Sequence, residues 1–337
     1  MSLPFDRLTD EQRGELPEES LPDRLEPMLA TLTREHFSDP DWLYERKLDG
    51  ERVIAYRSDA GVRLRSRNDE ELDGTYPEVQ EAVARATDLR CVLDGEVVAF
   101  DGARTSFSKL QSRLQITDPD QARASDVTVY LYVFDLLHLD GRSTRDLPLR
   151  TRKSLLRAAL SFDDPLRWVI HRNEDGEAWL EEACAKGWEG LIAKRAAAPY
   201  QHGRSRAWLK FKCVNRQEFV IGGYTDPEGA RDRFGALLIG YHEEGDLRYA
   251  GKVGTGYDQQ TLDRVGDLLD QRERRTSPFR DGPDGSDLHF VTPDLVAEVG
   301  FTEWTRDGRL RHPRYLGLRE DKPAEEVVRE TPVTGTT

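Results

Sequence analysis

Short apolar runs rich in β-branched and aromatic residues follow one another through the first two thirds of the chain. They begin after an acidic, proline-containing extension over residues 1–25 that shows no clear periodicity. Runs of this kind, separated by polar turns, predict short β-strands. The expected strands cover 43–47, 53–57, 62–65, 91–93, 96–100 and 127–135. The last run is almost wholly apolar, so it should lie buried at the centre of a sheet.

Apolar residues at helical spacing interrupt these strands and predict helices over 77–86, 151–159 and 175–186. Pro77 suits the first turn of the first helix, and Gly187 suits a C-terminal stop after the last. A second β-rich unit follows Lys212. Its expected strands, over 218–224, 236–241, 247–253 and 295–304, together with a helix near 258–271, are typical of a small OB-type barrel. The pattern therefore predicts an α+β protein with two domains.

Composition places the chain among proteins that fold in water. One third of its 337 residues are charged, and the mean hydropathy is -0.70. No run of about 18 apolar residues is present, and the first residues lack the layout of a signal peptide, so we expect a cytoplasmic protein. Cys91, Cys184 and Cys213 are too few and too scattered for a disulfide framework or a four-cysteine zinc site. We expect them to pack in the core.

Charge is distributed unevenly along the chain. The net charge of -14 argues by itself against a nucleic-acid partner, because lysine and arginine dominate phosphate binding. Between Leu191 and Gln217, however, no residue is acidic. The basic residues of this stretch are Lys194, Arg195, Arg204, Arg206, Lys210, Lys212 and Arg216. Such an asymmetric field can attract a polyanion to one face, although a set of unrelated solvated surfaces is the alternative.

A reactive lysine is the first candidate for chemistry. Lys47, Asp49, Gly50 and Arg52 form the pattern K-x-D-G-x-R between two expected strands. At pH 7 only about one lysine amine in 2,500 is neutral, so a nucleophilic lysine needs cationic neighbours or a metal to lower its pKa. A charged hairpin turn is the competing interpretation for this pattern alone.

Further candidates lie at the ends of the expected strands. Leu93-Asp94-Gly95-Glu96 and Trp188-Glu189-Gly190 each place a glutamate at the start of a strand after a tight turn. Two such carboxylates suit a divalent cation, which prefers oxygen ligands, although either alone is more often a surface residue. In 208–212 strict alternation puts Lys210 and Lys212 on one face of a strand and the apolar residues on the other.

Taken together, these residues resemble the six-motif signature of the covalent nucleotidyltransferases, the superfamily of ATP-dependent DNA ligases, RNA ligases and mRNA capping enzymes. The matching residues, in order, are Lys47 through Arg52, Arg67, Glu96, Phe134, Glu189, Lys210 with Lys212, and Arg319 through Lys322. The resemblance covers nearly all of 27–330.

Within the superfamily the chain is most similar to the ligase domain of bacterial end-joining ligase D. The stretches that suggest it are Pro27 through Thr31, Phe107 through Gln111 with Arg113, Tyr249 through Gly256, and Arg311-His312-Pro313 through Pro323. The resemblance implies an N-terminal extension over 1–25, an adenylation (nucleotidyltransferase) domain over 26–214, an OB-fold domain over 215–330 and a tail over 331–337.

The resemblance also implies an activity. Lys47 would attack the α-phosphate of ATP, release pyrophosphate and form a lysyl-AMP phosphoramidate. AMP would then pass to the 5′-phosphate of a DNA nick, and the 3′-hydroxyl would displace it and seal the strand. ATP and Mg2+ or Mn2+ are the implied cofactors, and nicked double-stranded DNA is the implied substrate in repair or end joining.

Roles for the other residues follow from the same resemblance. Glu45 would contact the adenine amino group and Phe134 would stack on the base. Ribose or phosphates would be held by Arg52, Arg67 and Arg204. Glu96 and Glu189 would organise ribose and metal, while Lys210 and Lys212 would bind the α-phosphate and lower the pKa of Lys47. Arg319, Asp321 and Lys322 would reach ATP only when the OB domain closes over the site.

Three other functions fit parts of the pattern: a capping guanylyltransferase, an RNA ligase, and a nucleic-acid-binding relative without catalysis. The approach to the last motif, Arg311-His312-Pro313, favours the DNA ligases over the capping enzymes. No large helical DNA-binding domain and no polymerase or phosphoesterase domain accompanies the motifs. We therefore expect a monomer that acts near the nucleoid, with no membrane partner. It would depend on a Ku-type end-binding protein or on separately encoded polymerase and nuclease proteins.

Overall fold

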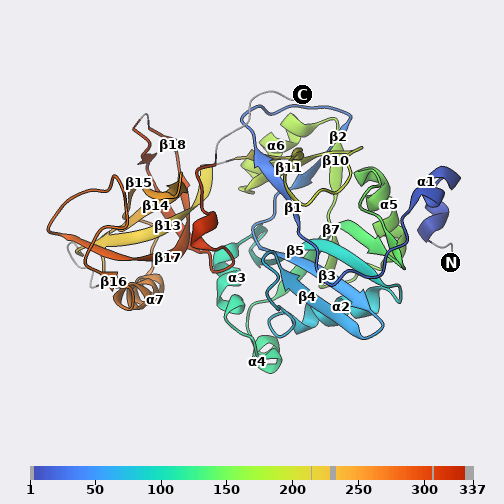
Figure 1. The fold of residues 1–337 in the computed structure, drawn as a ribbon, viewed down its shortest axis with the longest axis horizontal. Helices are drawn as coiled ribbons and strands as arrows, with labels where there is room; N and C mark the ends of the chain where they lie inside the picture. The colour runs from blue at the N-terminus through green and yellow to red at the C-terminus, as the bar shows by residue number, and fades with distance from the viewer. Residues whose placement is uncertain (1–3, 214, 228–232, 306, 331–337) are drawn as a thin grey trace. The chain divides into compact units, whose positions relative to one another are not determined.

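The chain folds into two compact units, which occupy 4–213 and 215–330 (Figure 1). The computed structural model describes residues 4–213, 215–227, 233–305 and 307–330. The expected tail over 331–337 lies outside these described residues. No helix in the described ranges is long and apolar enough to cross a membrane.

One sheet of the first unit contains the arginine and the first glutamate of the predicted site. Its strands lie in the order β4 (Gly61–Ser66), β3 (Glu51–Ser58), β5 (Cys91–Asp101), β7 (Val129–Leu139) and β8 (Arg142–Ser143), and neighbours are antiparallel. At its margins β6 (Arg104–Thr105) pairs with β5, and β9 (Leu166–Trp168) runs parallel to β7. Arg52 on β3 pairs with Glu96 on β5.

A second sheet contains the lysine pair, and the predicted nucleophile follows one of its strands. Its order is β1 (Met28–Leu32), β12 (Gly203–Lys212), β11 (Gly190–Arg195), β2 (Trp42–Arg46) and β10 (His171–Asn173). β1 runs parallel to β12, whereas the other neighbours are antiparallel. Lys47 directly follows β2 at the end of an inner strand.

Alternating side chains divide the first unit into layers. On β3, Val53 and Ala55 enter one core with helix α2 (Pro77–Ala86) and helix α5 (Leu149–Ala159). Ile54, between them, enters a different core that also contains Phe134 from β7 and Trp208 from β12. Because one core takes residues from both sheets, it lies between them. A third core packs helix α6 (Gly176–Ala185) on the second sheet.

The predicted helices of the first unit are confirmed. α2 has the predicted bounds, and α5 and α6 lie within two residues of theirs. α6 ends in a Schellman motif, in which Trp188 N–H donates to Ala183 O and Gly187 N–H to Cys184 O. Gly187 has φ +69°, as this motif requires. Helices α3 (Phe107–Leu114) and α4 (Pro119–Arg123), and the short strands β1, β6, β8, β9 and β10, were not predicted.

The acidic N-terminal segment packs on the first unit. It forms the 3-10 helix η1 (Pro4–Arg7) and the helix α1 (Asp10–Glu15), whose N-terminus is capped reciprocally by Thr9 and Gln12. Leu8 and Leu16 are buried in the same core as α5. The segment shows no clear sequence periodicity because its two helices are short, although it is folded.

The tight turn predicted at Asp94-Gly95 is wrong. β5 runs without a break from Cys91 to Asp101, and its pairing with β7 shifts register between Asp94 and Gly95. A side chain at Gly95 would come within 2.8 Å of Tyr132 O, so this glycine allows two strands to approach rather than a chain reversal. Asp94 is consequently buried inside the sheet.

The prediction that all three cysteines only pack in the core is also wrong. Cys184 and Cys213 form a disulfide between the last turn of α6 and the end of β12, with their Cα atoms 5.2 Å apart. Cys91 is free and buried, as predicted. The cysteines are 29 residues apart in sequence. They meet because α6 packs beside β11, and the antiparallel β12 ends next to it.

The second unit is built on one antiparallel sheet with a helix, α7 (Gln259–Asp270). Its strands follow the order β15 (Asp246–Val253), β14 (Leu237–Glu243), β13 (Asn215–Thr225), β17 (Leu288–Phe301) and β16 (Glu273–Arg274), and β20 (Arg314–Leu318) pairs with β17. A hairpin joins β18 (Glu303–Trp304) to β19 (Leu310–Arg311), and η2 (Ala324–Glu326) follows β20. The predicted helix and the strands predicted over 218–224, 236–241 and 247–253 are confirmed. The strand predicted over 295–304 is β17, which begins earlier and ends at Phe301, while β18 is a separate strand.

Candidate active site

The candidate nucleophile is ion-paired. Lys47 Nζ lies 2.6 Å from Glu189 Oε1, and its side chain is 19% exposed. Its N–H donates to Gly190 O, which holds it beside the start of β11. Burial alone would lower the pKa of Lys47, but Glu189, helped by Asp49 and Glu96, raises that pKa well above its ordinary value. In this ion pair Lys47 is held as an ammonium, and the lowering of its pKa by Lys210 and Lys212 stays a prediction.

Strand register brings the predicted lysines to the same face as Lys47. Gly190, which Lys47 contacts, pairs with Lys212, and Ile192 joins Glu45 on one side to Lys210 on the other. The next row joins Leu43, Lys194 and Trp208. Trp208 thus shares the lysine face, contrary to the prediction that apolar residues of this strand turn away.

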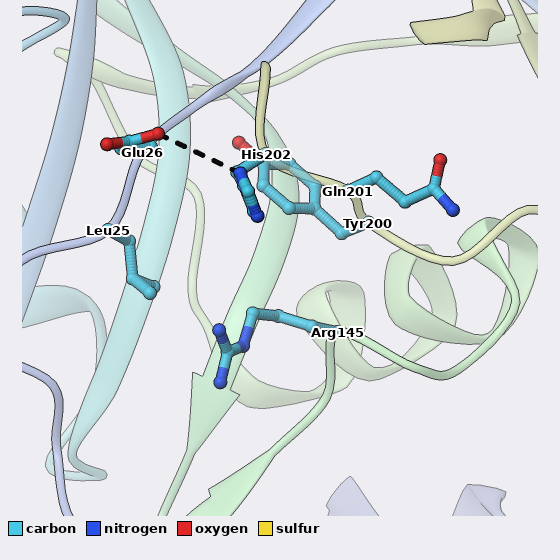
Figure 2. A pocket seen from close by; sticks show the side chains of 6 residues that line it. All are labelled: Leu25, Glu26, Arg145, Tyr200, Gln201 and His202. Atoms are coloured by element: carbon cyan, nitrogen blue, oxygen red, sulfur yellow. Dashed lines mark ion pairs between the residues drawn. The ribbon is translucent and has the colours of Figure 1, made fainter. Parts of the chain in front are cut away.

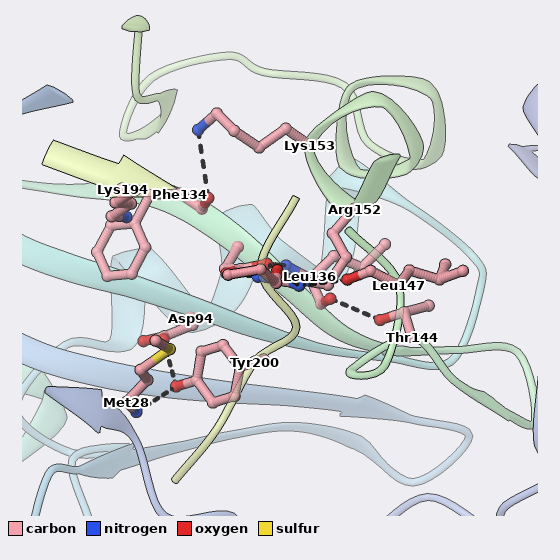
Figure 3. Close-up of polar contacts among 12 residues, drawn as sticks. Met28, Asp94, Phe134, Leu136, Thr144, Leu147, Arg152, Lys153, Lys194 and Tyr200 are labelled. Carbon is pink, nitrogen blue, oxygen red and sulfur yellow. Dashed lines mark hydrogen bonds and ion pairs between the residues drawn. The ribbon is translucent and has the colours of Figure 1, made fainter. Parts of the chain in front are cut away.

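Arg52 faces this group from the first sheet, where a buried carboxylate holds it. Arg52 Nε and Nη2 donate to the Asp94 carboxylate at 2.5 and 2.6 Å. Tyr200 donates its hydroxyl to the same carboxylate at 2.6 Å and accepts from Met28 N–H at 2.8 Å (Figure 3). Burial and the Asp94 charge raise the pKa of Tyr200, so its hydroxyl stays a donor.

The remaining predicted arginines lie at the margins. Arg67 is in the turn after β4, and the register of that strand places it alongside Arg52. Arg204, on β12, is exposed and donates to Ala30 O at 3.1 Å. The structure thus brings Arg52 into the buried site, whereas Arg204 stays at its surface.

Asp49 and Gly50 shape the loop after the nucleophile. Asp49 Oδ2 accepts from the N–H of Phe107, the first residue of α3. A side chain at Gly50 would lie only 2.1 Å from Val97 O, so this position has no room for a side chain.

A buried group of two lysines and one glutamate lies behind Lys47, and sequence reasoning missed both lysines as site residues. Lys153 on α5 donates to Glu45 Oε1 at 2.6 Å. It also donates to Phe134 O at 3.3 Å (Figure 3). Lys194 lies 2.6 Å from Glu45 Oε2. Its ammonium is 4.1 and 4.0 Å from the ring centroids of Phe134 and Trp208. Burial would raise the pKa of Glu45, but the two lysines lower it.

Among the described residues, no group of three or more His, Cys, Asp or Glu side chains could hold an ion. Glu96 and Glu189 both lie close enough to Lys47 to raise its pKa. Two carboxylates with phosphate oxygens would give the oxygen-only donor set that Mg2+ or Mn2+ prefers. The residues present therefore fit a cation that arrives with a nucleotide.

The last predicted residues belong to the second unit. Arg319, after β20, donates to both Asp321 carboxylate oxygens at 2.9 and 2.8 Å. Lys322 Nζ donates to Glu218 Oε2 at 3.2 Å. These contacts form within the second unit, between groups of opposite charge.

A cavity of about 660 Å³ opens beside the Tyr200 contacts (Figure 2). It is lined by Leu25, Glu26, Arg145, Tyr200, Gln201 and His202. None of the predicted site residues is among them. The cavity therefore borders the buried network without containing the candidate nucleophile.

Comparison with known proteins adds the family. Residues 27–212 match the model of the ATP dependent DNA ligase domain, which is more than half of the chain. The chain belongs to the ATP-dependent DNA ligase family. Residues 230–322 of this ligase-family chain also match the ATP dependent DNA ligase C terminal region.

Relatives of this ligase-family chain include larger proteins. It is 39% identical over 322 residues to the multifunctional non-homologous end joining protein LigD of Pseudomonas aeruginosa, covering 93% of this chain and 37% of that protein. It is 34% identical over 297 residues to a DNA ligase of Natronomonas pharaonis, covering 84% and 52%. The chain thus spans about two fifths to one half of the length of these relatives.

The fold of this ligase-family chain is similar to that of a solved ligase structure. A mycobacterial DNA ligase D complexed with ATP and MES has a TM-score of 0.66 and 37% identity, covering 91% of this chain and 98% of that one. The predicted α+β class, with a nucleotidyltransferase domain followed by an OB-fold domain, is confirmed.

Proposed function

We propose that this chain is an ATP-dependent DNA ligase that seals nicks between a 3′-hydroxyl and a 5′-phosphate through a lysyl-AMP intermediate. The observation that supports it most is the placement of Lys47 against Glu189, on the face that also presents Lys210 and Lys212. The similarity to end-joining proteins named LigD supports a role in DNA end joining or repair.

In the first step Lys47 Nζ forms a bond to the α-phosphorus of ATP, and the bond to pyrophosphate breaks. Only the neutral amine has a lone pair for this attack, so the ion pair with Glu189 must loosen and Nζ must first lose a proton, which solvent water accepts. Lys210 and Lys212 then oppose reprotonation because they place positive charge on the same face. The second and third steps transfer AMP to the 5′-phosphate and release it when the 3′-hydroxyl attacks.

The surrounding residues would hold the nucleotide. Phe134 would stack on the base, Glu45 would meet the adenine amino group, and Arg52, Arg67 and Arg204 would hold ribose or phosphates. Trp208 Nε1 has no hydrogen-bond partner among the described residues although the side chain is 2% exposed, which supports a ligand at this face. Glu96 and Glu189 would hold Mg2+ or Mn2+, which would neutralise phosphate charge.

The second unit and the partners complete the proposal. Arg319, Asp321 and Lys322 would orient pyrophosphate as leaving group when the OB-fold domain closes. Nicked duplex DNA is the proposed substrate, and a Ku-type end-binding protein or separately encoded polymerase and nuclease proteins are the proposed partners. The protein would act as a cytoplasmic, nucleoid-associated monomer.

Sealing of a labelled nicked duplex tests this function. We expect the protein to join nicked DNA with ATP and a divalent cation, and to fail with GTP. Sealing confined to nicked RNA would make it an RNA ligase, and labelling by GTP in place of ATP would make it a capping-type enzyme. Failure to form any nucleotide adduct would leave only nucleic-acid binding.

A further inference from the structure

We propose that Lys194, beside the Glu45 already proposed to meet the adenine amino group, selects adenine, and that Lys153 is the positioning residue that fixes Glu45. The inference rests on the proposed use of ATP and goes beyond it, because it names the groups that distinguish one purine from another. Lys194 Nζ and Glu45 Oε2, 2.6 Å apart, place a hydrogen-bond donor directly beside an acceptor. The pair lies next to the rings of Phe134 and Trp208.

This order of donor and acceptor complements adenine. Adenine carries an amino donor at C6 with a ring-nitrogen acceptor beside it, whereas guanine carries a carbonyl acceptor at C6. Adenine would therefore donate its amino hydrogen to Glu45 and accept from Lys194 at the adjacent ring nitrogen. Guanine would turn its carbonyl oxygen toward the Glu45 carboxylate, where like partial charges repel. A site that leaves buried polar groups unpaired rejects the wrong ligand strongly.

Glu45 and Lys194 can each form a further hydrogen bond to a nucleotide base. An ionised carboxylate offers about four lone-pair positions, and the contacts of Glu45 with Lys153 and Lys194 use one at each oxygen. A lysine ammonium has three N–H donors, and the ion pair of Lys194 with Glu45 needs one. The indole N–H of Trp208, buried without a partner among the described residues, adds a donor at the same place.

Lys153 fixes the carboxylate to the stacking ring. Its single ammonium contacts both Glu45 Oε1 and the backbone carbonyl of Phe134, and the side chain is 2% exposed. Because Glu45 lies on the second sheet and Phe134 on the first, this contact sets the distance between the amino-group acceptor and the stacking ring.

Stability alone does not require the second lysine. Two buried ammonium groups on one carboxylate leave excess positive charge in the protein interior, which is costly. Burial lowers the pKa of Lys194 in spite of Glu45, which is the expected sign of that cost. A hydrogen-bond acceptor of the bound base at Lys194 would offset the cost of burying this charge.

Nucleotide analogues separate this inference from the proposed function. Binding of ATP, GTP, 1-deaza-ATP, 7-deaza-ATP and purine riboside triphosphate is measured by equilibrium dialysis in EDTA, and labelling of Lys47 is measured with Mg2+. We expect the unmodified protein to bind ATP at least about tenfold more tightly than GTP, than purine riboside triphosphate, and than one of the two deaza analogues. Labelling by none of the nucleotides would defeat the proposed function. Labelling with equal binding of ATP and both deaza analogues would overturn the role of Lys194 alone.

Three variants assign the roles. Lys194→Met keeps a straight apolar chain, so ATP binding should weaken at least about tenfold while binding of the sensitive deaza analogue stays unchanged. Lys153→Met should weaken ATP binding much more than binding of purine riboside triphosphate, which stacks on Phe134 but lacks the amino group. Retained binding of purine riboside triphosphate also shows that the variant is folded. Lys186→Met, on an exposed lysine, is the matched control and should change nothing. Equal losses for every nucleotide in the Lys194 or Lys153 variant would reduce that residue to a structural role. If neither variant folds, the analogue ratios of the unmodified protein decide the matter.

Discussion

At the level of single residues, the Glu189 carboxylate has two opposed effects on the reaction of Lys47 with ATP. Glu189 holds the amine 2.6 Å away and raises its pKa, which hinders attack. The same carboxylate is a proposed ligand of the cation that ATP needs. Replacing it should therefore lower the rate yet make the amine easier to deprotonate.

We expect Glu189→Gln to shift the acid limb of the pH profile of kcat/KM for self-adenylylation to lower pH. The raised pKa of Lys47 depends on the negative charge, and kcat/KM reports groups of the free enzyme. Sealing at the optimum should fall strongly because the amide is a poor metal ligand. Glu182→Gln, at an exposed glutamate, is the control. An unmoved acid limb would show that Glu189 does not control the amine.

The sequence pattern predicts some residues of the candidate site and misses others. Alternation along β12 correctly predicts Lys210 and Lys212 on one face. The same alternation places Trp208 on that face, but its apolar side chain led to the wrong prediction that it faces the other way. Lys194 interrupts an apolar strand, a signal that could have been used. Lys153 gives no such signal, because its contact with Glu45 spans 108 residues of sequence.

At the scale of elements, helices with caps and strands with clear alternation were predictable, while contacts between distant segments were not. α2 begins with a proline and α6 ends at Gly187, and both were predicted closely. Asp94-Gly95 resembles a turn locally, but pairing with β3 and β7 keeps β5 continuous. The disulfide depends on the packing of α6 beside β11, which sequence separation does not reveal.

That disulfide should stabilise the first unit measurably. Closing a loop of this length reduces the entropy of the unfolded chain, and such bonds typically contribute about 2–4 kcal/mol. We expect a dithiol reductant to lower the thermal midpoint of the unmodified protein. The double variant Cys184→Ser with Cys213→Ser should start lower and show no response. A midpoint indifferent to reductant in both proteins would mean that the bond adds no stability.

At the level of the whole molecule, the proposed closure of the OB-fold domain separates steps that share one active site. Asp321 accepts from Arg319, and Lys322 pairs with Glu218, within the second unit. They would be needed only while pyrophosphate is the leaving group. We therefore expect Asp321→Ala or Lys322→Ala to lose self-adenylylation by orders of magnitude, about 1.4 kcal/mol for each tenfold, yet to seal a pre-adenylated nick without ATP.

Variants of residues in the first unit serve as controls for the Asp321 and Lys322 variants. Lys47→Ala should also seal the pre-adenylated nick, because the amine has no part in the last step. Lys210→Ala and Glu96→Ala should fail in it, since both would contact AMP throughout. Equal losses in the first and last steps for the Asp321 and Lys322 variants would refute closure of the second unit as a separate event.

The central claim is that Lys47 forms a covalent bond to AMP, and intact-protein mass spectrometry tests it most directly. After incubation with ATP and Mg2+, we predict a species heavier by one AMP, located on the peptide that contains Lys47 and removed by pyrophosphate. Lys47→Ala and Lys47→Arg should both lack it, because a guanidinium is never appreciably deprotonated. An adduct retained in either variant, or none in the unmodified protein, would contradict the account.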